Sequence, residues 1–291
     1  MITYSYPRLE ARVTQMSLFG PSESGPDPKP VDDRRVRLQL LITVKAAPNP
    51  SEKYGETVCV AGLRTDTLRT SWVRLYPINF RHLDSDEAFR KYDIISVEAK
   101  PARQDQRRES WKPMMDTLRK ENRLDTWKSR RPLLDPCVED SMCRLNRDAQ
   151  ARPDAQSLAL VRPSEVRGFK VTRHEGWTPE EQRKIEAYAS QPDLFSGRSR
   201  TPLQAPRFKA AYHYRCHESG CRGHKQHVID WELVALQRRL HGYSDAALAQ
   251  ALEAKFLNEM CAPGRDVAFY VGNQAKRVHT FSVLGVYWPK R

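Results

Sequence analysis

Short stretches rich in β-branched and aromatic residues, each bounded by turn-forming residues, recur along this chain and constrain its fold more than any other feature. Four of them predict strands in the first half, at residues 36–45, 57–63, 72–76 and 94–100. Their close spacing in the chain favours antiparallel neighbours. The sequence therefore predicts a small, mostly antiparallel sheet in a β-rich domain at residues 34–103.

The second half of the chain mixes strand and helix patterns. Thr178 is followed by Pro179 and Glu181, which together supply an N-cap, a proline in the first helical turn and a capping-box acid. This predicts a helix to about residue 189, and Ser244 caps another. The predicted strands are 157–161, 165–172, 208–214, 267–271 and 280–288, and the further helices are 231–240 and 244–260. We expect an α+β domain at 151–291, and the fold class of the whole chain is α+β.

Two stretches are expected to be loop-like. Residues 1–33 hold several Gly and Pro and few apolar residues, which predicts a disordered tail, and residues 190–206 predict a long loop. No apolar run approaches the roughly 18 residues that span a bilayer, and the first residues show no secretory pattern. We therefore expect a cytoplasmic protein without membrane contact.

Positive charge is concentrated in the middle of the chain. The 49 Lys and Arg exceed the 36 Asp and Glu, for a net charge of +13. Residues 104–150 predict a basic helical segment interrupted by prolines. Such a surplus attracts polyanions, above all nucleic acid. A solvated helical face, with Trp111 and Trp127 as core anchors, explains the pattern equally simply. The candidate phosphate-binding residues are Arg103, Arg107, Arg108, Lys112, Arg130 and Arg131.

Cysteine and histidine cluster at residues 212–227, which read YHYRCHESGCRGHKQH. His213 with Cys216, and Cys221 with His224, show the two-residue spacing that lets neighbouring side chains reach one ion. Thiolate and imidazole ligands suit tetrahedral Zn²⁺, and two glycines in the segment permit tight turns. We predict a structural zinc site formed by His213, Cys216, Cys221 and His224.

The identity of the fourth zinc ligand stays open, because this order of ligands matches no standard zinc finger. Cys137 and Cys143, separated by five residues, give only a weak metal signal. The alternative to a site is a set of surface histidines near two unrelated thiols. The candidates for the fourth ligand are His213, His217, His227, Cys261 and His279.

Two peptides share one spacing: residues 15–19 read QMSLF and residues 191–195 read QPDLF. Both resemble the short peptide by which bacterial polymerases and repair factors dock on the β sliding clamp. The resemblance implies a hydrogen-bonding Gln and a Leu-Phe pair in an apolar cleft, although Met16 and Pro192 replace the commonest Leu. The alternative is that each pair folds back onto this protein. The implied clamp-binding residues are Gln15, Leu18, Phe19, Gln191, Leu194 and Phe195.

Two constellations suggest metal-dependent cleavage of nucleic acid. Glu98 and Lys100 point to one side of a predicted strand, with Asp84, Asp86 and Asp93 before them. This pattern resembles the D…(D/E)-x-K core of restriction-like nucleases, which implies Mg²⁺, although a half-buried strand with a polar side explains it equally well.

The second constellation, Asp230 and Glu232, follows the Cys/His segment closely enough to serve a metal. Acidic residues at a helix start are also favoured by the helix dipole, so a purely structural role accounts for both residues.

Several phrases resemble a prokaryotic family with a zinc site, associated with mobile-element and defence loci. They are WVRLYPI at 72–78, FRKYDII at 89–95, ESWKP at 109–113, CRGH at 221–224 with IDWE at 229–232, FYVG at 269–272 and TFSVLGVYWP at 280–289. The resemblance implies a genomic context, including antiviral defence, and no particular chemistry.

The sequence therefore predicts a zinc-containing protein that binds DNA or another nucleic acid and docks on the sliding clamp, acting in replication, repair, mobile elements or phage defence. One alternative is a metal-dependent nuclease, and another is an adaptor whose positive charge meets an acidic protein partner.

Overall fold

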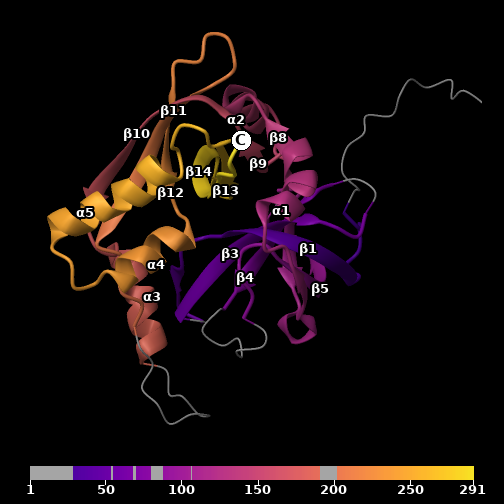
Figure 1. Ribbon diagram of the computed structural model, residues 1–291. Coiled ribbons are helices and arrows are strands. Elements are labelled where there is room, and N and C mark those ends of the chain that lie inside the picture. Colours follow the sequence, from indigo (N-terminus) through magenta and orange to yellow (C-terminus); the bar gives the residue numbers. More distant parts are fainter. Residues whose placement is uncertain (1–28, 54, 68–69, 80–87, 106, 191–201) are drawn as a thin grey trace, which may run out of the picture.

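Two seven-stranded sheets form the framework of the protein in a computed structural model, which describes residues 29–53, 55–67, 70–79, 88–105, 107–190 and 202–291. The predicted α+β class is confirmed, with sheets dominant. In Figure 1 the strands β1, β3 and β4 lie in the lower half of the view, and β10 to β14 lie in the upper half. Within the described residues, no helix is long and apolar enough to cross a membrane.

The first sheet closes into a barrel. Its strands follow the order β1-β3-β4-β6-β5, and β5 pairs back with β1. β4 and β6 run parallel and the other neighbours are antiparallel, so the predicted small, mostly antiparallel sheet is in fact a closed barrel with one parallel pairing. The short β2 and β7 pair with β3 and β5. The bounds are β1 (Val36–Lys45), β2 (Asn49–Ser51), β3 (Gly55–Arg64), β4 (Trp72–Ile78), β5 (Asp93–Pro101), β6 (Ser110–Pro113) and β7 (Arg119–Arg123).

β1 illustrates why the sequence of a barrel strand is nearly continuously apolar in this protein. Leu38, Leu40 and Ile42 lie in one buried cluster with residues from β3, β4 and β5. Leu41 and Val44, on the other side of the strand, lie in a second cluster that includes residues of the other sheet. Both faces of β1 are therefore buried, and the strand needs few polar positions.

The expected basic helical segment at 104–150 is wrong in its first part. This stretch contains β6 and β7 before the helices α1 (Trp127–Leu134) and α2 (Met142–Ala151), with short 3-10 turns η2 (Met115–Thr117) and η3 (Asp135–Cys137). All residues of β7 are exposed, so this strand is held by pairing with β5 rather than by apolar side chains. Its sequence carries no alternation from which a strand could be predicted.

The second sheet is open, with the order β10-β11-β12-β14-β13-β9-β8. The pairs β12–β14 and β8–β9 are parallel, and the other neighbours are antiparallel. Its strands are β8 (Val138–Glu139), β9 (Leu158–Val161), β10 (Pro163–Arg173), β11 (Phe208–Cys216), β12 (His224–Val228), β13 (Ala268–Gln274) and β14 (Arg277–Tyr287).

The helices of this half begin where the sequence predicted them. They are α3 (Pro179–Ala189), α4 (Trp231–Arg239) and α5 (Asp245–Glu253), which continues into a π-helical turn, η4 (Ala254–Glu259). The predicted capping box at Thr178 is present, with the Glu181 carboxylate accepting from the Thr178 backbone N–H. Residues of α2, α5 and η4 share a buried core with Tyr212 and Phe269 of the sheet.

Polar and apolar contacts join the two sheets. The buried Glu109 carboxylate accepts hydrogen bonds from the Ser157 N–H at 2.8 Å and hydroxyl at 2.6 Å. The buried Arg74 guanidinium donates to the Ser157 carbonyl at 3.1 Å, and Arg107 donates to the Asn273 carbonyl at 2.6 Å. Hydrogen bonds of buried polar groups therefore join the barrel to the second sheet, in place of contacts at the surface alone.

Candidate metal centre

Three cysteines and one histidine converge at one end of the second sheet. The ligand atoms of Cys143, Cys216, Cys221 and His224 all lie within 4.8 Å of one another. The Nε2 atom of His224 is 3.5 Å from the Cys143 sulfur, 3.4 Å from that of Cys216 and 3.3 Å from that of Cys221. The sulfurs of Cys216 and Cys143 are 3.7 Å apart. Four donor atoms thus surround one point, a geometry compatible with a bound metal ion.

Regular structure positions each of these side chains. Cys216 ends β11 and His224 begins β12, while Cys221 lies in the turn between these strands. Gly223 in that turn has φ of 107°, a conformation that side-chain-bearing residues rarely adopt. Cys143 comes from the first turn of α2, more than 70 residues earlier. The cluster therefore ties a local turn to a helix that is remote in sequence.

The thiols of the cluster influence one another electrostatically. Although burial opposes it, hydrogen bonds from the Cys143 backbone and the His224 side chain lower the pKa of Cys216 to about 6. Burial, together with hydrogen bonds to the thiols of Cys216 and Cys221, raises the pKa of Cys143 to about 12. One thiol ionises readily, and its charge then opposes ionisation of the next. A divalent cation removes this conflict, because metal-bound cysteine is deprotonated.

A surrounding layer of polar contacts holds the ligands in place. Ser141 caps α2 by accepting from the Arg144 N–H at 2.9 Å, and its hydroxyl donates to Glu218 in the turn. The same Glu218 pairs with Arg147 of α2. Arg215 donates to the Cys221 carbonyl at 2.8 and 2.6 Å. These contacts fix the helix against the turn and orient two of the cysteines.

His213 does not join the cluster, although the sequence favoured it as a ligand. Successive side chains of a strand point to opposite faces, so His213 and Cys216, three residues apart on β11, cannot face the same ion. Cys143 takes the predicted place of His213. The other candidates, His217, His227, Cys261 and His279, also lie outside the group. The signal for Cys143 was weak because its partners are distant in sequence, and its spacing from Cys137 was the one indication that the sequence analysis found.

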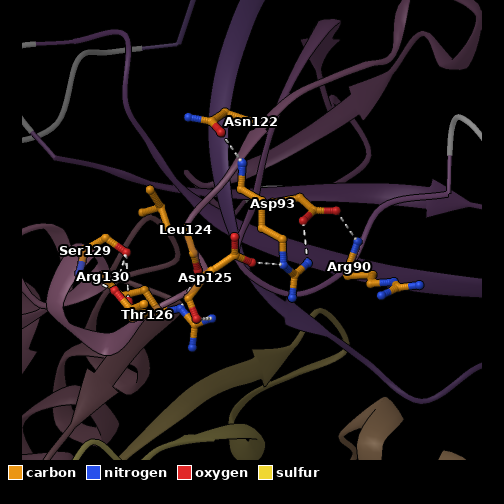
Figure 2. Close-up of polar contacts among 9 residues, drawn as sticks. Arg90, Asp93, Asn122, Leu124, Asp125, Thr126, Ser129 and Arg130 are labelled. Atoms are coloured by element: carbon orange, nitrogen blue, oxygen red, sulfur yellow. Dashed lines mark hydrogen bonds and ion pairs between the residues drawn. The ribbon is translucent and has the colours of Figure 1, made fainter.

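The nuclease-like constellation on the barrel is not assembled among the described residues. Glu98 and Lys100 share the outer side of β5, where Glu98 faces Arg35 at 3.6 Å. Asp93 is buried at the other end of the strand, and its carboxylate binds Arg123 at 2.6 Å. Figure 2 shows Asp93 also accepting from the Arg90 backbone N–H. Residues 84 and 86, the other acids in the pattern, lie outside the described residues.

Asp230 and Glu232 serve the start of α4 and lie outside the metal cluster. Asp230 is the N-cap and accepts from the Glu232 N–H at 3.0 Å. Burial raises the pKa of Asp230 to about 7. Against the effect of burial, the carboxylates of Glu232 and Asp230 raise the pKa of Lys91, which lies 3.8 Å from Glu232. These residues form a charge cluster where the barrel meets α4.

The predicted phosphate-binding residues divide into buried and exposed members. Arg107 is half-buried and pairs with Asp105 and the Asn273 carbonyl, while Arg130 is buried and donates to two carbonyls. Arg103, Arg108 and Arg131 are partly exposed and pair with Asp33, Glu109, Asp135 and Asp266. Lys112, like Arg103, is exposed. Trp111 is buried, as the alternative of a core anchor expected, whereas Trp127 is half-buried and packs edge-on against Tyr287.

Both clamp-like peptides, with residues Gln15, Leu18, Phe19, Gln191, Leu194 and Phe195, lie outside the described residues. Docking on the sliding clamp therefore stays a prediction from the sequence.

The fold and the cluster define the chain as a two-sheet α+β protein with a Cys₃His cluster. Residues 138–291, more than half of the chain, match the family model "Domain of unknown function (DUF8757)", and the chain belongs to this family. Residues 36–136 match "Domain of unknown function (DUF8758)". All four residues of the cluster lie within the DUF8757 region.

No curated protein matches this chain. Among solved structures, the crystal structure of the p204 HINb domain is similar over 90% of this chain and 100% of that chain, with 8% identity and a TM-score of 0.30. A likeness at that level carries no argument about either fold or function.

Proposed function

We propose that the Cys143, Cys216, Cys221 and His224 side chains hold a structural Zn²⁺ in a nucleic-acid-binding protein. The observed separations support zinc as the ion. A tetrahedron with Zn–S bonds of about 2.3 Å and a Zn–N bond of about 2.0 Å places sulfurs about 3.8 Å apart and sulfur and nitrogen about 3.5 Å apart. The cluster's sulfur–sulfur distance of 3.7 Å and sulfur–nitrogen distances of 3.3–3.5 Å fall close to this shape.

A structural role follows from the number of ligands. Catalytic zinc sites keep one position for water or substrate, whereas four protein ligands close the coordination sphere. Cys216 and Cys221 are buried, which also keeps reactants away from the ion. The zinc would join α2 to the β11–β12 turn, and its binding free energy would add directly to the stability of this half of the molecule.

The net charge of +13 is the observation that carries the nucleic-acid part of the proposal. An ion pair within the protein neutralises one anion for each cation, so internal pairing cannot remove this surplus. A surplus of that size attracts polyanions over long range, and nucleic acid is the commonest of them.

The barrel adds support by analogy. With the short β2 set aside, its order β1-β3-β4-β6-β5-β1, with β4 and β6 parallel, is the strand order of an OB-fold barrel. Many OB folds bind oligonucleotides or oligosaccharides. A fold shared with binders is weaker support than a site, and the charge carries the greater part of the argument.

The first test measures the metal. The purified chain is expected to hold about one zinc per molecule by plasma mass spectrometry, as a closed four-ligand site requires. Cys143→Ser should lose the metal during dialysis against a weak chelator, whereas His213→Asn should keep it. Cys261→Ser is the matched control, because that thiol lies outside the cluster. Zinc retained by Cys143→Ser and lost by His213→Asn would refute the assigned ligand set.

The second test measures nucleic-acid binding as a function of salt. Labelled single-stranded and duplex DNA, with Mg²⁺ or with EDTA, should be retarded intact on native gels, and affinity should fall steeply as salt rises. Failure to bind either form at low salt would refute the nucleic-acid proposal. Cleavage seen only with Mg²⁺ would refute the non-enzymatic role and favour a nuclease.

A further inference from the structure

A cavity of about 650 Å³ lies where the barrel meets the helices of the second half. The barrel side contributes Arg90, Lys91 and Tyr92, from the turn before β5, and Arg123 from β7. Helix α1 contributes Trp127 and Arg130, and the opposite wall comes from α4, η4 and the end of the chain. Junctions of this kind and cavities of this size are common places for small ligands in proteins.

The lining of this cavity is strongly cationic. Six of its residues are Lys or Arg, and Glu232 is the only carboxylate among them. Lys91 is 3.8 Å from Glu232, and Lys255 pairs with the neighbouring Glu259 at 2.6 Å. Arg123 binds Asp93 and Asp125 at 2.6 and 2.8 Å. Each of these three cations is therefore already balanced within the protein.

The other three guanidinium groups have no carboxylate partner among the described residues. Arg90 and Arg239 are exposed at the cavity, and Figure 2 shows the Arg90 side chain directed away from the Asp93 carboxylate. Arg130 is buried, and its guanidinium donates to the carbonyls of Leu124 and Asp125, at 2.6 and 2.7 Å, and lies against aromatic rings. Three unbalanced positive charges therefore converge on one hollow, which is an arrangement suited to a multiply charged anion.

Aromatic rings complete the cavity. The Arg130 guanidinium lies 3.9 Å from the Tyr92 ring centroid and 4.9 Å from that of Trp127. Trp127 and Trp288, both half-buried, contact each other edge to face at 6.3 Å, which leaves part of each indole at the cavity. Tyr92 holds φ of 70°, a left-handed conformation that is uncommon for a bulky residue and clusters at ligand sites. A solvated basic face would need neither the hollow nor the rings.

The usual ligand-binding strands of an OB-type barrel are closed off in this protein. Those strands are β3 and β4, and their side chains Ala61 and Leu63 share a buried cluster with Leu158, Leu160 and other residues of the second sheet. Trp72 of β4 contacts Tyr270 edge to face at 6.3 Å. Bases that stack on this protein must therefore use another surface, and the cationic cavity presents the indoles of Trp127 and Trp288.

We propose that this cavity binds a nucleoside phosphate, with Arg90 and Arg239 at the phosphate and the indole of Trp127 or Trp288 against the base. The inference rests on the proposed nucleic-acid function and names its ligand. The nucleoside phosphate is either a free mononucleotide or one unit of a single strand. The paired bases inside a duplex are stacked on their neighbours and cannot reach an indole, so a single strand is the nucleic-acid form that fits.

The test compares two double variants that remove the same charge. Arg90→Ala with Arg239→Ala changes the cavity, and Arg183→Ala with Arg277→Ala changes two exposed arginines outside it. Fluorescence anisotropy is measured with labelled oligothymidylate of about 20 nucleotides, with a duplex of similar length and with a fluorescent adenosine monophosphate. All four arginines are exposed, so both variants should keep the wild-type melting temperature.

The cavity variant should bind oligothymidylate at least about tenfold more weakly than the control variant. The slope of log affinity against log salt should also be shallower for the cavity variant than for the control variant, by about 1.4. Two phosphate contacts are lost, and each contact on a single strand contributes about 0.7 to this slope. Trp288→Phe, which keeps an aromatic ring, should weaken binding less than the loss of both arginines. Weakening of the mononucleotide as well would identify a pocket for free nucleotides, and weakening of the strand alone a site for a strand unit; either result supports the proposal.

Two results would overturn it, and they are distinguishable. If wild type binds oligothymidylate and the cavity and control variants weaken it equally, nucleic acid binds elsewhere, and the cavity proposal falls while the proposed function stands. If wild type binds none of the three probes, the proposed function and the cavity proposal fail together.

Discussion

The two sheets of this protein solve the problem of sheet ends in different ways. The barrel closes by hydrogen bonding, since β5, the fifth strand in the order β1-β3-β4-β6-β5, also pairs with β1 over six residue pairs from Val36 to Leu41. The second sheet stays open, with β8 and β10 at its ends. In this open sheet, the segment that follows β8 contacts the β11–β12 turn in two ways. Cys143 joins the Cys₃His cluster, and the Asp140 carbonyl accepts a hydrogen bond of 2.9 Å from the His217 N–H.

This difference indicates which interactions stabilise each half of the molecule. A closed barrel has no free edge, and its interior is filled by aliphatic side chains such as Leu38, Leu40 and Val97. The open sheet relies on α2, which contributes Met142 and Leu145 to the core but has no ladder of hydrogen bonds to hold it there. A metal can supply this fixation at a single point, so the second half should depend on the metal and the barrel should not.

The largest expected effect comes from removing a metal ligand. Cys221→Ser leaves three ligands, and we expect the second half to lose about 4 kcal/mol or more of stability. Hydrogen exchange should then show lost amide protection in α2, β11 and β12, with β1 and β5 unchanged. Cys137→Ser, a half-buried thiol outside the cluster, should behave like wild type. Equal loss of protection in the barrel would break the comparison, because both halves would then unfold as one unit.

The next effect tests how strongly the halves are coupled. Glu109→Ala removes the buried carboxylate that accepts from both Ser157 donors, and it removes one of the negative charges near the buried Arg74. We expect a loss of about 3 kcal/mol, typical of breaking a buried charged contact. Urea unfolding should separate into two transitions, one for each half. The exposed Asp154→Ala is the control, and a single unshifted transition in Glu109→Ala would show that apolar contacts alone couple the sheets.

Much of this architecture was predictable, because local signals and tertiary structure agree for most elements. The stretch 36–45 was predicted as a strand and is β1, and the capping residues at Thr178 marked the start of α3. β6 and β7 were missed because their sequences carry charges and prolines in place of alternation. The closure of the barrel by β1 and β5 could not be predicted, since pairing between distant strands leaves no trace in the local sequence.

The metal cluster was predictable only where its ligands are neighbours in sequence. Cys216, Cys221 and His224 fall within nine residues, and a turn with Gly223 brings them together. Cys143 reaches the site only because α2 packs on the sheet, and no spacing rule encodes that approach. The basic segment shows the reverse problem. Charge counts cannot tell a buried Arg130, held by carbonyls, from an exposed Arg90 at a cavity.

A pH dependence should sharpen the view of the junction between the halves. Asp230 lies beside Ala46 of the barrel in a β-bridge, and burial raises its pKa to about 7 from an ordinary value of 3.8. Between these values the folded protein keeps a proton that the unfolded chain has lost, so stability falls as pH rises, by up to about 1.4 kcal/mol per pH unit. The effect is fully present below pH 3.8 and lost above pH 7.

Asp230→Asn should remove that slope while keeping the side-chain oxygen that caps α4. The measurement is the free energy of unfolding of both proteins in urea from pH 4 to pH 8. Wild type should lose stability relative to the variant as pH rises through this window. Identical pH profiles would mean that Lys91 keeps the Asp230 carboxylate charged throughout, and that the junction is held by an ion pair.

The smallest effect separates the two functions of one helix cap. Ser141 caps α2, and Thr178 caps α3, so the Ala variant of either should cost about 1 kcal/mol. Only Ser141 also contacts Glu218 in the ligand-bearing turn, and only α2 carries a metal ligand. Ser141→Ala should therefore weaken zinc affinity about tenfold in a competition titration, as loss of a contact behind the ligands does elsewhere, while Thr178→Ala leaves it unchanged. Equal zinc affinity in both variants would mean that α2 is held by its apolar face alone, and that the metal joins an arrangement already fixed without it.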